Sequence, residues 1–90
     1  MITLFERDTV DDYDTWAKAF AAFGPTLKAK GVVASSVYRS VENPNDITVA
    51  HDFATLAEAK AFLGSRELDA ARPGAGVETG PTVWFTEKVG

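Results

Sequence analysis

The fold is decided by one stretch in the middle of the chain, Ile47-Thr48-Val49-Ala50-His51-Asp52-Phe53. It is short, mostly apolar and rich in β-branched residues, and it holds the only histidine of the sequence. A polar turn precedes it at residues 42–46, and a helix start follows it at Thr55. An apolar run with these flanks is typical of a strand buried inside a sheet. We therefore expect residues 47–53 to form a central strand.

The residues before this strand predict its hairpin partner. Residues 32–40 alternate between two faces, and a turn of Asn, Pro, Asn and Asp links them to the central strand. In one register of this hairpin Tyr38 lies beside His51. A shift of one residue places Arg39 or Val37 there instead, so the register stays open.

Helical spacing and capping residues predict the remaining elements. Asp11 or Asp12 caps a helix with one apolar face, which Gly24-Pro25 interrupts. Thr55 and Glu58 form a capping box for a helix that ends at Gly64, and Ser65 caps one or two further turns to Ala71. Residues 72–76 are predicted to be loop because Pro and Gly disfavour a helix. The order is strand, helix, strand, strand, helix, strand, over residues 2–7, 13–30, 32–40, 47–53, 55–71 and 82–88.

This order predicts an α+β, ferredoxin-like βαββαβ fold, a four-stranded antiparallel sheet with the helices on one face. Ninety residues make a single domain, 1–90. Several strands carry apolar side chains in both directions, so the other face of the sheet needs a cover. A second copy of the same sheet is the simplest cover, and we expect a homodimer.

The composition excludes several classes of function. The sequence has no cysteine and one histidine, which argues against disulfides and a protein-bound metal, and no cofactor is expected. Thirteen acidic and nine basic residues, a net charge of −4, argue against nucleic acid. No apolar run approaches about 18 residues, so no membrane span is expected and a cytoplasmic location is predicted.

Four groups of residues give the chain a family resemblance. They are Val10 to Trp16, Tyr38-Arg39 with the turn at 43–46, Ala59 to Leu63, and Gly80 to Phe85. With these residues the chain resembles the dimeric α+β-barrel superfamily, and within it the small antibiotic-biosynthesis monooxygenases. The resemblance implies two sheets paired face to face, each half with a cavity between sheet and helices.

The resemblance also implies a range of activities. Some members oxidise or cyclise polycyclic aromatic compounds without metal or cofactor, others degrade haem, and many have no known activity. The enzymes tend to use an Asn, a Trp and an aromatic or basic residue around the cavity. In this chain Asn43 and Asn45 lie in the predicted turn, so a catalytic Asn is not carried over.

Five residues are candidates for a site. His51 is the candidate base, since imidazole titrates near neutrality, and the alternative is a packed histidine. Tyr38, Trp84 and Tyr13 suit an aromatic-substrate pocket, and packing in the core or the dimer interface is the alternative. Arg39 is a candidate for neutralising a ligand anion, or else it pairs with an acidic side chain. The charges at positions 6 and 7 are interpreted as ordinary edge or barrel-rim charges.

Three functions remain open. The first is a cofactor-independent monooxygenase- or cyclase-like enzyme acting on a small aromatic, polyketide-type molecule. The second is a non-catalytic ligand-binding or accessory homodimer, which gains if phenylalanines fill the cavity (Phe5, Phe53, Phe62 and Phe85). The third, ranked last, is haem binding with His51 as axial ligand.

Overall fold

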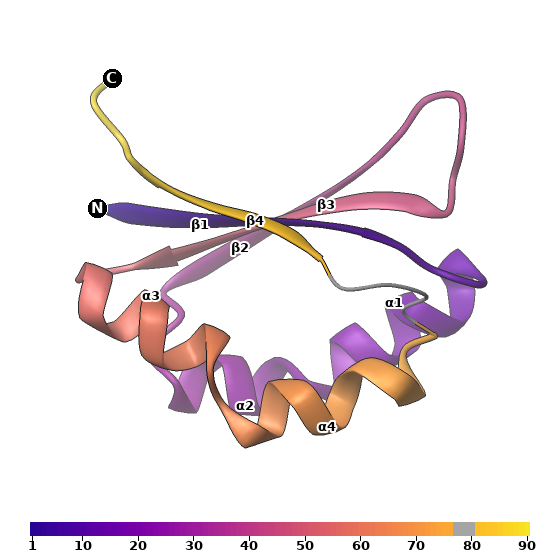
Figure 1. Cartoon of the computed structure of the whole chain (residues 1–90), viewed down its shortest axis with the longest axis horizontal. Helices are drawn as coiled ribbons and strands as arrows, with labels where there is room; N and C mark the ends of the chain where they lie inside the picture. Colours follow the sequence, from indigo (N-terminus) through magenta and orange to yellow (C-terminus); the bar gives the residue numbers. More distant parts are fainter. Residues whose placement is uncertain (77–80) are drawn as a thin grey trace.

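The computed structural model describes residues 1–76 and 81–90, and its strands and helices follow the predicted order. Each of the two predicted helical regions is divided in two, as Gly24-Pro25 and Gly64 predict, which gives four helices (Figure 1). The elements are β1 (Ile2–Thr9), α1 (Tyr13–Ala22), α2 (Gly24–Ala29), β2 (Ala34–Arg39), β3 (Asp46–Phe53), α3 (Leu56–Leu63), α4 (Arg66–Gly74) and β4 (Thr82–Glu87).

The sheet has the order β2-β3-β1-β4, and all three strand pairs are antiparallel. The helices lie on one side of it, and no described element covers the other face of the sheet (Figure 1). The ferredoxin-like prediction is therefore confirmed. So is the central position of residues 47–53, because β3 pairs with β2 on one side and with β1 on the other.

The hairpin register differs from each of the predicted ones. Ser35 lies opposite His51, and Tyr38 lies opposite Thr48. The reason is a longer turn, because β2 ends at Arg39 and the Ser40 hydroxyl accepts hydrogen bonds from the next backbone amides. The predicted neighbours of His51 on this strand were therefore wrong.

The predicted helix starts are confirmed by their caps. The Asp12 carboxylate accepts a hydrogen bond from the Thr15 amide at 2.9 Å and begins α1. Thr55 accepts from the Glu58 amide at 3.2 Å and begins α3, as in a capping box. Ser65 begins α4 in the same way. Each cap satisfies a backbone donor that the helix leaves unpaired.

The predicted loop at residues 72–76 is in part helical, which is a correction. Helix α4 continues through Pro73 to Gly74. A proline in the last turn removes only one intrahelical hydrogen bond, and the Ala75 amide still donates to Ala71 O at 3.1 Å. The helix ends where Gly76 takes a positive φ of 73°.

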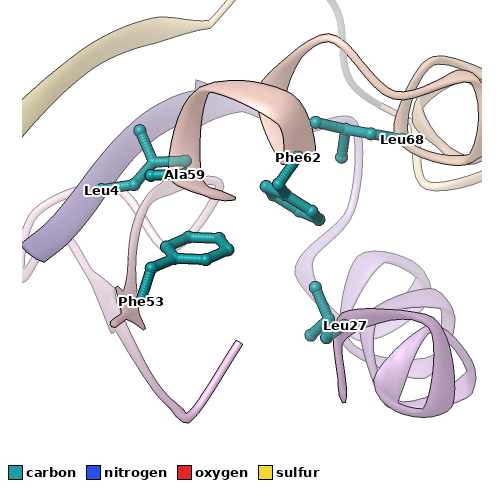
Figure 2. Packing of buried hydrophobic residues seen from close by; sticks show 6 residues of the cluster. All are labelled: Leu4, Leu27, Phe53, Ala59, Phe62 and Leu68. Atoms are coloured by element: carbon teal, nitrogen blue, oxygen red, sulfur yellow. The ribbon is translucent and has the colours of Figure 1, made fainter. Parts of the chain in front are cut away.

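The core lies between the sheet and the helices. β3 directs Ile47, Val49, His51 and Phe53 toward the helices, and all four are buried. One cluster joins β1, β3 and three helices (Figure 2), through Leu4, Leu27, Phe53, Ala59, Phe62 and Leu68. A second cluster surrounds Trp16 near the start of α1. Within the described residues, no helix is long and apolar enough to span a membrane.

Candidate active-site cavity

A cavity of about 60 Å³ lies between the sheet and helices α1 and α4. Aromatic side chains make much of its wall, among them Trp16, Phe20 and Phe62. Four polar side chains from three elements also line it: Glu6, Asp8, His51 and Arg72. An apolar wall with a few convergent polar groups is the usual character of a small-molecule site.

His51 lies in this cavity between two aromatic rings. Phe20 stacks on the imidazole at 6.1 Å between ring centroids, and Phe62 meets it edge-on at 5.3 Å. Its Nδ1 is hydrogen-bonded to the Ser35 hydroxyl at 2.7 Å. Burial lowers the pKa of His51 to about 4, against a smaller opposing effect of the Asp52 charge. The imidazole is therefore neutral at pH 7, and its role as a base stays a prediction.

A carboxyl pair on β1 is the strongest polar feature of the cavity. Glu6 and Asp8 are only 7% and 5% exposed, and Arg72 Nη2 of α4 donates to Glu6 Oε1 at 2.5 Å. Burial, together with the neighbouring Glu6 charge, raises the pKa of Asp8 to about 7, although Arg72 acts in the opposite direction. Asp8 is thus a carboxyl group that gains and loses its proton near neutral pH.

The interpretation of Glu6 as an ordinary edge charge is wrong, and Asp8 and Arg72 were missed. One signal in the sequence could have found the two carboxyl groups. Positions 4, 6 and 8 of a strand share one face. Ile2 and Leu4 are apolar on that face, and the structure buries Glu6 and Asp8 beside Leu4 on it.

Tyr38 and Trp84 lie on the opposite face of the sheet from His51. Directly opposed residues of antiparallel strands share a face. Tyr38 is opposite Thr48, and Trp84 is opposite Phe5, on which it stacks at 5.3 Å. Both side chains are well exposed, at 58% and 41%. The prediction that they line one cavity with His51 is wrong for a single chain, and their role in substrate binding stays a prediction.

Tyr13 and Arg39 contact one another on the helix side of the sheet. The Arg39 guanidinium lies 4.5 Å from the centre of the Tyr13 ring, a cation–π contact. Neither residue lines the cavity. Arg39 therefore joins the edge strand β2 to the start of α1, and a substrate role for either residue stays a prediction.

The described residues do not form a cluster of metal ligands, and the cavity as it stands is small for a haem. Among the described residues, no three His, Asp or Glu side chains are placed to hold a metal ion. An apolar cavity that accepts benzene has a volume of about 150 Å³. At about 60 Å³ this cavity is smaller than that, so a haem would need a far larger opening than a single ring does.

Comparison with solved structures gives close matches over the whole chain. A candidate antibiotic biosynthesis monooxygenase from Bordetella bronchiseptica superposes with a TM-score of 0.84 at 22% identity, covering 98% of this chain and 96% of its own. The cofactor-independent oxygenase SnoaB of Streptomyces nogalater superposes with a TM-score of 0.81 at 13% identity. The match covers 99% of this chain and 93% of SnoaB. The chain has the antibiotic biosynthesis monooxygenase fold. The predicted resemblance is confirmed at this level.

One of the similar structures is of a protein without a known function. A protein of unknown function from Nitrosomonas europaea, NE2512, superposes with a TM-score of 0.78 at 21% identity, covering 99% of this chain and 89% of its own. Neither a protein-family model nor a curated protein sequence matches the chain. The side chains of the cavity are therefore the evidence for the reaction that this chain could carry out.

Proposed function

We propose that this protein is a small cofactor-independent oxygenase- or cyclase-like enzyme that acts on an aromatic, polyketide-type molecule in the cavity. The observation that carries the proposal is a buried carboxyl group, Asp8, that faces a cavity with aromatic walls. The fold shared with SnoaB agrees with it. Trp16, Phe20 and Phe62 would hold an aromatic ring by stacking and edge contacts.

Asp8 is a better proton acceptor in this cavity than His51. A general base works best when its pKa lies near the working pH. The pKa of Asp8 is raised to about 7, whereas burial lowers that of His51 to about 4. We assign proton removal to Asp8. The hydrogen bond to Ser35 holds the His51 ring in place, and we assign to His51 the orientation of the ligand.

The oxygenation step needs no redox group from the protein. Removal of a proton from a benzylic methylene gives a carbanion, and its electrons reduce dioxygen while a C–O bond forms. The resulting hydroperoxide loses water and leaves a carbonyl group. One dioxygen then supplies one oxygen atom to the product and one to water. The protein contributes proton transfer, orientation and exclusion of bulk water.

Entry of a ring requires the cavity to widen. Its present volume of about 60 Å³ is below the ~150 Å³ that holds benzene. Half-buried side chains of its wall include Phe20 of α1, Phe23 between α1 and α2, and Ala71 of α4. We expect α1 and α4 to move apart when a substrate binds.

The proposed active form is a homodimer that pairs the uncovered sheet faces. That face carries the Phe5–Trp84 stack and the exposed Tyr38. Exposed aromatic side chains of this kind are typical of interfaces between subunits. In such a dimer Tyr38 and Trp84 would bind the partner subunit.

A non-catalytic ligand-binding homodimer is the second candidate, and the small cavity favours it. Of the phenylalanines expected to fill the space, Phe62 does line the cavity. Phe53 is packed in the adjacent core, whereas Phe5 is stacked on the other face of the sheet. The cavity is therefore narrowed by Phe62 and is not filled.

Oxygen consumption tests the proposal against this second candidate. Aromatic ketones of one, two and three rings, each with a benzylic methylene, are mixed with the protein in buffer containing a chelator. We expect oxygen uptake with carbonyl formation, and loss of both in Asp8→Asn. The exposed Asp14→Asn of α1 is the matched control. Binding of the ketones without oxygen uptake would support the non-catalytic function.

A further inference from the structure

Two buried polar atoms have no hydrogen-bond partner within residues 1–76 and 81–90. They are Asp8 Oδ1 and Arg72 Nε. Both residues line the same cavity. The carboxyl oxygen is an acceptor and the guanidinium N–H is a donor, so together they form an unused donor and acceptor set. A buried polar group without a partner destabilises the protein, so binding of a molecule that satisfies both atoms would be favoured.

The guanidinium is held in place by its other nitrogens. Arg72 Nη2 donates to Glu6 at 2.5 Å, and Nη1 lies 3.7 Å from Asp69 of the same helix. The side chain therefore cannot turn to pair Nε elsewhere without breaking the ion pair with Glu6. The unpaired N–H is a fixed feature of the cavity wall.

The charges of the cavity favour a neutral ligand. Arg72 is already neutralised by Glu6, so an anionic ligand would add negative charge beside Asp8 and Glu6. A cationic ligand would lie close to the guanidinium. A neutral molecule with an oxygen acceptor for Nε and an acidic hydrogen for Oδ1 would complement both atoms without adding charge.

We infer that the cavity recognises an enolisable carbonyl compound, whose oxygen accepts a hydrogen bond from Arg72 Nε while a hydrogen on the adjacent carbon faces Asp8 Oδ1. The inference rests on the proposed function in one respect, that the cavity is the ligand site. It adds an activity that needs no dioxygen, enolisation with exchange of the adjacent hydrogen.

The exchange step is a balanced proton transfer. The C–H bond breaks, its proton forms an O–H bond on Asp8 Oδ1, and its electron pair forms the C=C bond of an enolate. The negative charge develops on the carbonyl oxygen beside Arg72 Nε. After the Asp8 proton exchanges with solvent, the reverse step returns a solvent hydrogen to carbon. Nothing is oxidised or reduced.

Deuterium exchange measured by proton NMR tests this activity. Cyclopentanone and indan-2-one are incubated in deuterated buffer without dioxygen, and the loss of the signal of the hydrogens next to the carbonyl is followed. We expect exchange at least about tenfold faster than in buffer alone, increasing with pH through about 7 as Asp8 ionises. Asp8→Asn should return the rate to that of buffer.

Arg72→Lys separates the donor role from the structural ion pair. Lysine keeps a positive charge for Glu6 and has no counterpart of Nε–H. Removal of one donor to a developing oxyanion lowers a rate by about 10²-fold or more. Because the expected enhancement over buffer starts at about tenfold, we expect exchange in Arg72→Lys to fall to the buffer rate with an unchanged thermal midpoint. The exposed Arg66→Gln of the same helix should exchange as the wild type does.

Several outcomes would overturn the inference: exchange at the buffer rate with both ketones, wild-type exchange in Asp8→Asn, or wild-type exchange in Arg72→Lys. The first of these indicates that water alone satisfies the two buried atoms. The proposed function fails separately. Exchange without oxygen uptake would exclude the oxygenase and leave the inference in place. Oxygen uptake that requires Asp8, with exchange of both ketones at the buffer rate, would exclude the inference and leave the oxygenase in place.

Discussion

Glu6 Oε1 and Arg72 Nη2 lie 2.5 Å apart and join β1 to α4 across 66 residues of sequence. Both side chains are largely buried. Attraction in a buried pair offsets the desolvation of its charges only while both partners are present. This contact therefore keeps α4 close to the sheet and gives the cavity one of its walls.

Removal of Arg72 alone should destabilise the fold. Arg72→Met leaves the Glu6 carboxylate buried without its partner, and we expect the free energy of unfolding in urea to decrease by about 3 kcal/mol. The double variant Glu6→Leu/Arg72→Met should recover most of this loss, because it contains no unpaired charge. A double variant as unstable as the single one would show that the ion pair itself is not the cause.

The stability of the wild type should change little between about pH 4 and 6.5, because two buried groups have opposite effects. The pKa of His51 is lowered from 6.5 to about 4, so His51 contributes stability above pH 6.5 that is lost as the pH falls to 4. The pKa of Asp8 is raised from 3.8 to about 7, so its contribution is present at low pH and is lost as the pH rises to 7.

Single variants should separate these two effects. Asp8→Asn removes the group whose stabilising contribution is lost as the pH rises. The free energy of unfolding of this variant should therefore increase from pH 4 to 6.5. In His51→Gln the free energy of unfolding should instead decrease as the pH rises, up to about pH 7. Each slope is at most about 1.4 kcal/mol per pH unit for one proton. Urea titrations at four pH values measure both, and parallel curves for the two variants would contradict the assignment.

The sequence predicted the elements of the fold because the signals for them are local. Apolar spacing on α1, the caps at Asp12, Thr55 and Ser65, and the alternation of β3 each involve residues within a few positions of one another. The hairpin register was missed, since side-chain hydrogen bonds of Ser40 decide where β2 ends. Pro73 was misread because a proline in the last turn of a helix removes only one backbone bond.

The site was less predictable than the fold, because it depends on which face of the sheet a side chain occupies and on contacts between residues far apart in the sequence. Trp84 was assigned to the cavity, and the pairing of β4 with β1 turns it to the other face, beside Phe5. Arg72 lies far along the chain from Glu6, and no spacing rule connects two such positions. The missed local signal was the position of Asp8 on the face that Leu4 marks as core.

Trp84→Glu should prevent pairing of two copies of the sheet. The proposed homodimer places Trp84 and Phe5 in its interface, where a buried and unpaired carboxylate is strongly unfavourable. Native mass spectrometry should give a dimer for the wild type and a monomer for this variant. Leu56→Glu, at a comparably exposed apolar position on α3, should stay dimeric. A monomeric wild type would exclude the face-to-face pairing.

The volume of the cavity should decide which ligands bind, and the side chain of Leu68 should limit that volume. Leu68 of α4 lines the cavity, and Leu4 of β1 belongs to the same core cluster without lining it (Figure 2). Truncation of either to alanine should reduce the free energy of unfolding by about 2–5 kcal/mol. Only Leu68→Ala enlarges the binding space toward the ~150 Å³ that holds an aromatic ring.

Calorimetric titration with indan-2-one separates the two variants. Leu68→Ala should bind it at least about tenfold more tightly than the wild type, which corresponds to 1.4 kcal/mol. Leu4→Ala, with a similar loss of stability, should bind it as the wild type does. Equal affinities in all three proteins would place the aromatic ligand outside this cavity, because a site that contains Leu68 cannot gain that much space without a change in affinity.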